Sequence, residues 1–228
     1  MKKIFLVLFV EIFLTGCLLN FNNMEEPKEI IFKHEEVEIP NVEEILEDLE
    51  IIEPKPESLT YYYPIDGFKE NILLKPFGLY STPGNSPVDP EHFTGYHTGV
   101  DIEITEDQID EDVWVYAVAD GTIEVIRTAS GYGGVMVMST IIDDESYFAL
   151  YGHIDIKSIS VEVGDEVTAG QKLAVLGEGY SVETDGERKH LHFSLYTGDN
   201  INLLGYVQNE SELDAWVDPE ELLIDLID

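Results

Sequence analysis

The chain has 228 residues, of which 44% are hydrophobic, so it can bury a core in one large domain or two small ones. Its charge is strongly one-sided, with 47 acidic residues against 12 lysines and arginines and a formal net charge of -35 at pH 7. Binding to nucleic acid and attraction to an anionic lipid surface both need clusters of basic residues, so the composition argues against both.

The first seventeen residues, MKKIFLVLFVEIFLTGC, have the pattern of an export signal, although Glu11 interrupts it. Two lysines precede an apolar run that is too short for a comfortable transmembrane helix. The run ends in Leu-Thr-Gly-Cys, which resembles the lipobox of bacterial lipoproteins, where the cysteine carries the lipid. Cys17 is the only cysteine, so no internal disulfide can form, and its alternative role is a lone buried thiol. We expect residues 1–17 to be a signal peptide with a lipobox, and the protein to be exported to the cell envelope and anchored only through a lipidated Cys17.

Residues 18–60 are predicted to be an acidic, flexible tether. They are dense in glutamate, contain Pro40, Pro54 and Pro56, and show no sustained strand alternation. A short amphipathic helix can begin at Asn41, but like charges repel along most of the segment and favour an extended chain. Such a tether would give reach to a folded domain behind an anchored cysteine.

From about Tyr61 onward, short runs rich in β-branched and aromatic residues recur. The runs are GVDIEI, VWVYAVA, TIEVIRTA, GVMVMSTII, SYFALYGHI, KSISVEV, QKLAVLG and HLHFSLY, and Gly, Asp, Asn and Ser turns separate them. Residues 61–228 are therefore expected to form an all-β domain, an antiparallel sandwich or flattened barrel of the barrel-sandwich hybrid kind. Asp218 and Pro219 are expected to open a short carboxy-terminal helix in DPEELLIDLID.

One segment, VEVGDEVTAGQKLAVLG, resembles half of a lipoyl or biotinyl carrier domain. Such carriers hold their cofactor on a lysine at a hairpin tip. The nearest lysine, Lys172, lies inside the Gly-Gln-Lys-Leu turn and strand, and the segment has no Asp-Lys or Glu-Lys tip. We therefore interpret the segment as part of the β architecture and not as a swinging arm.

The stretch RKHLHFSLY, residues 188–196, carries two of the six histidines of the chain. Side chains alternate between the two faces of a strand, which places Leu191, Phe193 and Leu195 on one face and His190, His192, Ser194 and Tyr196 on the other. Two imidazoles on one polar face indicate either a metal site or an ordinary solvated surface. Taken alone, the solvated surface is the commoner of the two.

A second polar pattern lies upstream in GYHTGVDIEI, where His97 and Asp101 share one face if the segment is extended. Three ligands drawn from His97, Asp101, His190 and His192 would combine imidazole nitrogens with one carboxylate, a set that suits Zn²⁺. Structural zinc usually takes four ligands and favours cysteine, which this region lacks, so the pattern indicates an open, catalytic site. Another histidine, His153, ends the aromatic-rich run ALYGHID.

These pieces occur in the order HTGVD, YGH, GDEVTAGQKLAVLG and HLHF, and together they resemble the lysostaphin/LytM-type zinc endopeptidases. That family consists of bacterial cell-wall hydrolases with a compact β core. The likeness runs from about Lys75 to Leu223, with KPFGLY similar to the first strand of the family and WVDPEELL to its closing segment. Tyr80 stands where the family usually has an arginine, and EGYSVETDGERKH is longer and more charged than the usual turn. Both departures bear on substrate preference.

By this resemblance, His97, Asp101 and His192 would bind one zinc ion per chain. His190 would be the general base for the zinc-bound water, and His153 would orient water or stabilise the developing oxyanion. Zinc lowers the pKa of bound water to roughly 7, close to that of an imidazole, so proton transfer between the two is chemically reasonable. The protein would then be a monomeric zinc metallo-endopeptidase that hydrolyses peptide bonds of peptidoglycan.

The alternative is a non-catalytic relative on the same fold, either a wall-binding module or an activator of another hydrolase. Degenerate relatives generally lose metal ligands, whereas all three ligand positions are filled here, which favours the enzyme. A carrier-like or purely structural β domain is a third interpretation, and the missing carrier lysine argues against it. His92 lies outside the matched motifs and is expected to be structural or exposed.

Overall fold

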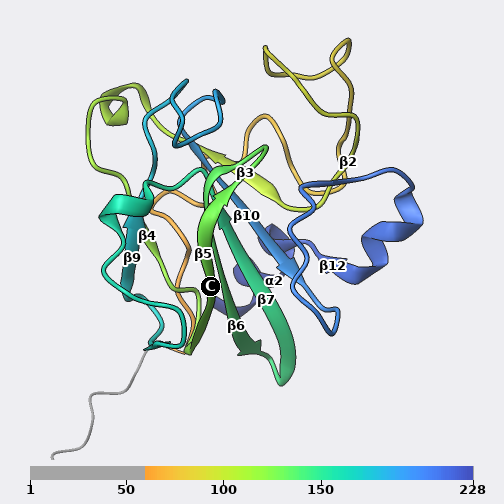
Figure 1. Ribbon diagram of the computed structural model, residues 1–228. Helices are drawn as coiled ribbons and strands as arrows, with labels where there is room; N and C mark the ends of the chain where they lie inside the picture. The colour runs from red at the N-terminus through yellow and green to blue at the C-terminus, as the bar shows by residue number, and fades with distance from the viewer. Residues whose placement is uncertain (1–59, 228) are drawn as a thin grey trace, which may run out of the picture. The chain divides into compact units, whose positions relative to one another are not determined.

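The computed structural model describes residues 60–227 of the protein (Figure 1). The predicted signal peptide, the lipobox with Cys17 and nearly all of the predicted tether, residues 18–60, lie outside the described residues. Within the part that is described, no helix is both long and apolar enough to cross a membrane.

A seven-stranded antiparallel sheet forms the centre of the fold, with the strand order β12-β10-β7-β6-β5-β8 and with β3 paired to β10 beside that path. Its strands are β3 (Val100–Glu103), β5 (Gly121–Ala129), β6 (Gly133–Ile142), β7 (Glu145–Gly152), β8 (Glu166–Val167), β10 (His190–Tyr196) and β12 (Trp216–Val217). Two smaller antiparallel sheets accompany it, one of β1 (Tyr80–Ser81), β2 (Gly95–His97) and β11 (Tyr206–Val207), the other of β4 (Trp114–Tyr116) and β9 (Lys172–Val175).

The sequence specifies the β6–β7 hairpin of this sheet through its turn. Strands β6 and β7 pair from Val135 opposite Gly152 to Ile142 opposite Glu145. The two residues between them, Asp143 and Asp144, both have positive φ, at 51° and 64°. A two-residue turn with positive φ at both positions matches the twist of antiparallel strands, and aspartate tolerates that conformation better than most residues. The hairpin is visible as the long pair labelled β6 and β7 in Figure 1.

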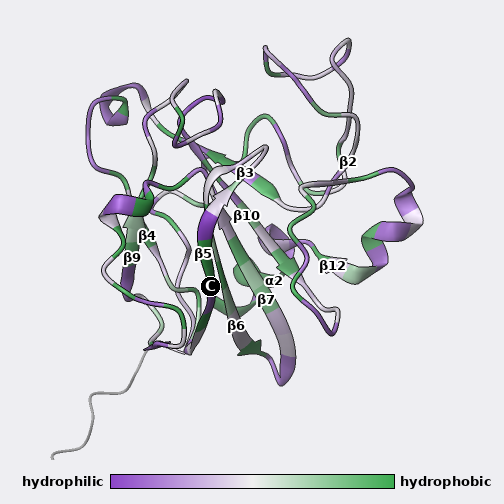
Figure 2. Ribbon diagram, in the orientation of Figure 1, coloured by the Kyte–Doolittle hydropathy of each residue, from purple (hydrophilic) through white to green (hydrophobic). Residues whose placement is uncertain are grey.

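The hydrophobic core lies along the strands of the main sheet, and hydrophilic residues gather in the loops at their ends (Figure 2). Large side chains with almost no exposed surface fill the core, among them Tyr151, Phe193, Ile102, Met136 and Met138. The hydroxyl of Tyr151 accepts a hydrogen bond from the backbone N–H of Val118 at 3.1 Å and donates to Sδ of Met138 at 3.4 Å. A tyrosine can be buried in this way because its polar atom has partners.

The all-β prediction is confirmed for the described residues, which form antiparallel sheets without a closed barrel, and so is the carboxy-terminal helix α2 (Pro219–Ile227). Asp218 caps this helix, since its Oδ1 accepts a hydrogen bond from the backbone N–H of Glu220 at 2.9 Å. Three short 3-10 helices complete the described elements, namely η1 (Glu106–Gln108), η2 (Ile156–Ser158) and η3 (Glu210–Ala215).

The strand expected in KSISVEV, residues 157–163, was a wrong prediction, because the segment begins inside η2 and continues without strand pairing. Side chains supply the reason. Oδ1 of Asp155 accepts from the backbone N–H of Lys157 at 2.9 Å, and the hydroxyl of Ser158 donates to the Asp155 carbonyl at 2.6 Å. The Ser158 hydroxyl also accepts from the backbone N–H of Val175 at 2.9 Å. Such side-chain bonds satisfy the backbone in a turn and compete with a strand ladder.

Candidate metal centre

Strand pairing brings Asp101 and His192 together. In the antiparallel pair of β3 and β10, these two residues are directly opposite each other, and the next pair of the same parity sets Glu103 opposite His190. Side chains that are directly opposite across two strands lie on the same face and in contact range. The predicted alternation of β10 is confirmed, since Leu191, Phe193 and Leu195 are fully buried, but His190, His192 and Ser194 on the other face are only 2% to 3% exposed. The histidine face is therefore covered and is not a solvated surface.

His97 reaches the same place from a different sheet. It ends β2, and the chain bends at Thr98 and Gly99 before β3 begins, so the extended segment that the sequence predicted is interrupted. The hydroxyl of Thr98 donates to the carbonyl of Leu204 at 2.7 Å and holds the bend. Gly99 is required there, because a Cβ at this position would clash with the carbonyl oxygen of Phe193. The bend turns the His97 ring toward Asp101 and His192.

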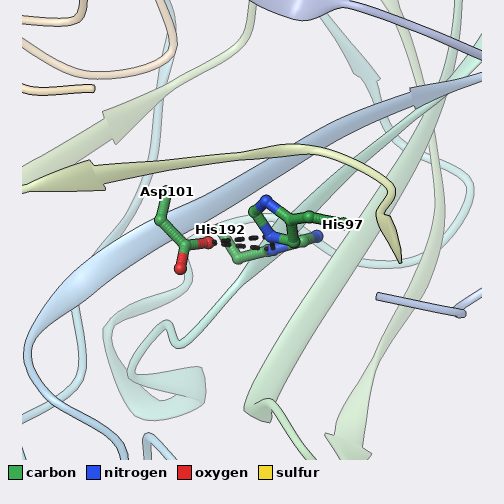
Figure 3. A group of neighbouring side chains, drawn as sticks. All are labelled: His97, Asp101 and His192. Atoms are coloured by element: carbon green, nitrogen blue, oxygen red, sulfur yellow. Dashed lines mark hydrogen bonds and ion pairs between the residues drawn. The ribbon is translucent and has the colours of Figure 1, made fainter. Parts of the chain in front are cut away.

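Three ligand-type atoms converge at this point (Figure 3). Nε2 of His97 lies 3.0 Å from Nδ1 of His192 and 3.2 Å from Oδ1 of Asp101, and Nδ1 of His192 lies 3.1 Å from the same carboxylate oxygen. Among the described residues, these three side chains are the potential metal ligands whose atoms lie close enough together to hold one ion. Ligands on a tetrahedral zinc at about 2.1 Å lie roughly 3.4 Å from one another, so a small outward movement would open this triangle around an ion.

The protonation pattern of the triangle also fits a metal. Nδ1 of His97 lies 3.2 Å from the carbonyl oxygen of Pro76, to which it can donate, and this leaves the lone pair of Nε2 free toward the triangle. Burial lowers the pKa of His192 from 6.5 to about 4, so this imidazole is neutral at pH 7, as a ligand must be. Burial alone would raise the pKa of Asp101, but the nearby His190 and His97 outweigh it and hold the pKa well below its ordinary value. Two imidazole nitrogens and one carboxylate are a donor set for zinc.

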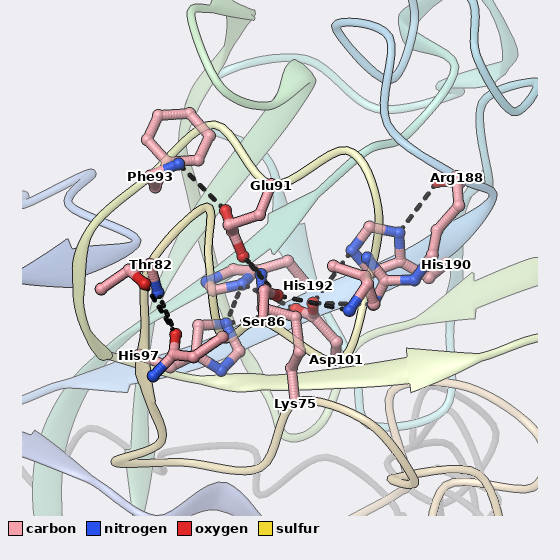
Figure 4. Close-up of polar contacts among 12 residues, drawn as sticks. Lys75, Thr82, Ser86, Glu91, Phe93, His97, Asp101, Arg188, His190 and His192 are labelled. Atoms are coloured by element: carbon pink, nitrogen blue, oxygen red, sulfur yellow. Dashed lines mark hydrogen bonds and ion pairs between the residues drawn. The ribbon is translucent and has the colours of Figure 1, made fainter.

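A second group of side chains contacts the carboxylate oxygen of Asp101 that points away from the triangle (Figure 4). Its other oxygen, Oδ2, accepts a hydrogen bond from Nη2 of Arg188 at 3.0 Å and lies 3.3 Å from Nε2 of His190. Arg188 also binds both carboxylate oxygens of Glu103, with its Nε at 2.9 and 3.1 Å from them. One oxygen of Asp101 therefore belongs to the triangle of ligand atoms, and the other to an arginine bridge between two carboxylates.

The two remaining predicted residues, His190 and His153, lie next to each other beside the triangle. Their ring centroids are 4.3 Å apart. Nδ1 of His190 lies 2.9 Å from the carbonyl oxygen of Arg188, which orients the ring. His153 follows β7 in the left-handed backbone conformation, with φ at 62°, an uncommon conformation for a histidine that is found more often at functional sites. Burial and the neighbouring His190 hold the pKa of His153 well below its usual value, so this ring is neutral at pH 7.

One protein family model matches part of the chain. Residues 95–203 match the model described as Peptidase family M23, and this stretch contains all five predicted site residues. Residues 95–203 are a Peptidase family M23 domain. The predicted kinship with LytM-type peptidases is thereby confirmed.

Solved structures of similar fold include peptidases. A zinc-containing peptidase from Vibrio cholerae is 26% identical, with 60% of this chain and 37% of that chain covered and a TM-score of 0.39. LytU is 24% identical, with 68% and 93% covered and a TM-score of 0.44. The protein CbpA from L. salivarius REN is 21% identical, with 73% and 95% covered and a TM-score of 0.45. The chain thus spans little more than a third of the Vibrio cholerae peptidase, and a comparison with curated proteins found no match.

A cleft of about 240 Å³ opens over the site of the M23 domain, and all five predicted site residues line it. The structure adds lining residues that the sequence analysis missed, among them Lys75, Glu91, Tyr132, Glu187, Arg188 and Tyr206. His92, which was expected to be structural or exposed, is exposed and does not line the cleft.

A buried ion pair, between Lys75 and Glu91, also lines the M23 cleft. Nζ of Lys75 lies 2.7 Å from Oε2 of Glu91 and 5.0 Å from the centre of the Tyr206 ring. The Glu91 carboxylate also accepts from the Ser86 hydroxyl at 2.9 Å and from the backbone N–H of Phe93 at 3.0 Å. Lys75 belongs to the KPFGLY segment, and the only sequence signal for its position was the likeness of that segment to the first strand of the family.

Tyr132 is one of three residues at this site with an unpaired buried polar atom. Its hydroxyl, Nδ1 of His153 and Nε2 of His192 are buried atoms without a hydrogen-bond partner among the described residues. Its ring centroid lies 5.3 Å from that of His192 and 5.8 Å from that of His153. Burial raises the pKa of Tyr132, so it is a neutral hydroxyl at pH 7. Buried polar atoms normally have hydrogen-bond partners, so three unpaired atoms at one cleft indicate that a polar ligand can bind there.

Proposed function

We propose that the M23 domain is a zinc metallo-endopeptidase that hydrolyses peptide bonds of peptidoglycan. The observation that carries the proposal is the triangle of His97 Nε2, Asp101 Oδ1 and His192 Nδ1, whose sides measure 3.0 to 3.2 Å. These three residues line a cleft that two further histidines also line. Three protein ligands are the number that catalytic zinc sites use, and their fourth position is open. The complete ligand set favours this function over a non-catalytic wall-binding module or an activator.

His97, Asp101 and His192 would hold the ion. Zinc bound there would supply a Lewis acid that lowers the pKa of a water molecule and polarises the carbonyl of the peptide bond to be cleaved. Asp101 is fixed for this task, since Arg188 donates a hydrogen bond to its Oδ2 and leaves Oδ1 to the ligand triangle. A ligand held by outer contacts loses less freedom when it binds a metal.

His190 is the proposed general base. The carbonyl of Arg188 accepts a hydrogen bond from Nδ1–H, which leaves Nε2 to accept the proton of the attacking water. Oδ2 of Asp101, 3.3 Å from Nε2, would stabilise the imidazolium that forms. The oxygen of the water adds to the carbonyl carbon, and His190 then returns its proton to the leaving amine as the C–N bond breaks.

His153 is proposed to stabilise the negative charge that develops on the carbonyl oxygen of the substrate. Its ring is neutral and packed beside that of His190, and its Nδ1 lacks a hydrogen-bond partner among the described residues. An N–H at this position is available to donate to the carbonyl oxygen as that oxygen gains charge. The donor is buried, so little water competes with the substrate for it.

The proposal extends to the location of the protein. Export, a lipid anchor at Cys17, a tether over residues 18–60, a catalytic domain over residues 61–228 and a monomeric state remain our expectations from the sequence. A domain on a tether would reach peptidoglycan at a distance from the membrane that anchors it. Replacement of Cys17 by serine should release the protein from the membrane fraction or leave its signal uncleaved, and a wild-type protein without an acyl group on its amino terminus would contradict the anchor.

Digestion of purified peptidoglycan tests the function directly. The protein as purified, the protein after removal of metal by a chelator, and the chelated protein with zinc restored are each incubated with the same material. Mass spectrometry should find fragments with newly formed peptide ends in the first and third samples and not in the second. Fragments that appear equally without metal, or fragments cut only in the glycan strands, would contradict the proposal. The Asp101→Asn variant is the matched control, because it keeps the shape of the side chain and removes the anionic ligand.

A further inference from the structure

The M23 cleft contains one negative charge that no neighbouring group pairs. Five charged side chains other than histidine line the cleft: Lys75, Glu91, Asp101, Glu187 and Arg188. Lys75 pairs with Glu91 at 2.7 Å, and Arg188 pairs with Asp101 at 3.0 Å. The carboxylate of Glu187 makes no hydrogen bond or ion pair with any residue that the structure describes, although the residue is only 9% exposed.

The backbone around Glu187 is fixed by hydrogen bonds from its own loop. Its carbonyl accepts from the backbone N–H of Tyr180 at 2.6 Å and from the hydroxyl of Thr184 at 2.8 Å, and its N–H donates to the carbonyl of Thr184 at 3.1 Å. Oδ2 of Asp185 accepts from the backbone N–H of Gly131 at 2.6 Å and ties this loop to a second segment that lines the cleft. The Glu187 side chain is thus held at the cleft by a preformed support, which lowers the entropic cost of using it to bind a ligand.

An unpaired carboxylate in this position is costly. Burial raises the pKa of Glu187, and the neighbouring groups that oppose this effect, chiefly His190, Arg188 and Lys75, all line the same cleft. Two of these neighbours, Lys75 and Arg188, already form ion pairs with other carboxylates. A buried charge without its own partner is destabilising, and a ligand of opposite charge would relieve that cost on binding.

The rest of the cleft suits a cation on an organic chain. The rings of Phe93 and Tyr206 stack at 5.5 Å and both line the cleft, as do the apolar side chains of Leu203 and Leu204. Aromatic faces attract ammonium groups, and leucine side chains can pack against methylene groups. An anionic substrate group would instead approach the unpaired Glu187 and would be repelled.

We propose that Glu187 is a binding subsite for a primary ammonium group of the peptide substrate, so that the domain favours peptides with a free amine near the bond that is cut. This inference rests on the proposed peptidase function and names the substrate feature that the site would select. It also gives a role to the longer, more charged segment before the His-x-His motif, since Glu187 belongs to that segment.

The activity experiment compares peptidoglycan whose stem peptides contain a diamino acid with the same material after acetylation of its amines. Wild-type protein should release fragments from the untreated material about ten to one hundred times faster, the range expected for a hydrogen-bonded ion pair. In Glu187→Gln this ratio should fall toward one. Glu178→Gln removes an equal charge from an exposed position outside the cleft, so it should keep the wild-type ratio and controls for long-range attraction to the acidic protein. A wild-type ratio near one, or an unchanged ratio in Glu187→Gln, would overturn the inference while cleavage itself still supports the proposed function.

A binding experiment keeps the inference testable if no cleavage occurs. Blocked tripeptides are titrated into the full chain and followed by NMR, one with a free lysine side chain, one with a free amino terminus and acetylated lysine, and one with both amines acetylated. The wild-type protein should bind at least one amine-bearing peptide about tenfold more tightly than the fully acetylated peptide, and the stronger of the two identifies the source of the ammonium. Glu187→Gln should lose this preference and Glu187→Asp should keep part of it. Equal binding of all three peptides by wild type would contradict the subsite even if the protein proves to be a peptidase.

Discussion

Arg188 holds Asp101 through the carboxylate oxygen that the two predicted histidine ligands do not share. Its Nη2 donates to Oδ2 at 3.0 Å, whereas His97 and His192 lie 3.2 and 3.1 Å from Oδ1. The same guanidinium also binds both carboxylate oxygens of Glu103. The arginine therefore restricts Asp101 to binding a metal through one oxygen and reduces the negative charge that the carboxylate offers.

Replacement of Arg188 should weaken zinc binding without removing a ligand. Outer contacts of this kind typically contribute about 10- to 100-fold in metal affinity, so Arg188→Gln should raise the dissociation constant for zinc by that factor. Arg188→Lys should fall between, because lysine keeps the charge and loses the two-pronged contact with Glu103. Competition with a chromophoric chelator measures the constants. Lys157→Gln is the control, since it removes a cation whose side chain is 83% exposed, and equal zinc affinities in Arg188→Gln and this control would refute the assignment.

The two histidines of β10 should fail differently when each is replaced by alanine. His192→Ala removes a proposed ligand, so zinc content and peptidoglycan cleavage should fall together. His190→Ala leaves the ligand triangle complete, so the protein should keep its zinc and lose about 10²- to 10⁴-fold in rate as the proton acceptor disappears. Elemental analysis and cleavage assays on the same preparations decide the matter. If His190→Ala loses its metal and His192→Ala retains it, the two roles are exchanged.

The sequence predicted the parts of this site that depend on local alternation and on motif order. The two faces of residues 190–196, the candidate ligands and the neighbouring His153 all follow from such patterns. Arg188 and Glu187 could not be found in this way, because their positions depend on a loop whose path is set by hydrogen bonds to distant segments, such as that between Asp185 and Gly131.

Two further features needed the fold. The contact between Asp101 and His192 depends on the register of β3 against β10, and one residue of slip would turn the carboxylate to the other face. His97 joins them only because the chain bends at Thr98 and Gly99, where the sequence alone suggested a continuous extended segment. The strand that the sequence predicted at 157–163 does not form. Hydrogen bonds from the side chains of Asp155 and Ser158 override its favourable β pattern.

Without metal, the folded protein should become less stable as the pH falls below neutral, because its buried histidines resist protonation. Burial depresses the pKa of His192 to about 4 and holds that of His153 well below 6.5, so both stay neutral in the folded state when the unfolded chain takes up protons. Their contribution to stability is fully present above about pH 6.5 and is lost as the pH falls through the window toward pH 4, by up to about 1.4 kcal/mol per pH unit for each group.

Urea denaturation of wild type and His153→Gln, each at pH 7.5 and pH 5, isolates the contribution of His153 to this pH dependence. The many carboxylates change the stability of both proteins with pH, but the variant lacks one titrating imidazole. Wild type should therefore lose more stability than His153→Gln between the two pH values, by about 1 to 2 kcal/mol. An equal loss in the two proteins would show that His153 takes up its proton as easily in the folded state as in the unfolded state.

Tyr151 should prove to be a core residue, although it belongs to the Tyr-x-His motif of the likeness to known peptidases. It is fully buried, and its hydroxyl is occupied by the N–H of Val118 and Sδ of Met138. Tyr151→Phe keeps the ring and leaves the buried N–H of Val118 without a partner, at a cost of about 1 to 3 kcal/mol. Thermal denaturation should show a lower midpoint, while zinc content stays at the wild-type value.

Tyr147→Phe is the matched control, because that ring is 8% exposed and its hydroxyl makes no hydrogen bond to a described residue. Loss of zinc or of cleavage in Tyr151→Phe at unchanged stability would instead assign the hydroxyl to the active site.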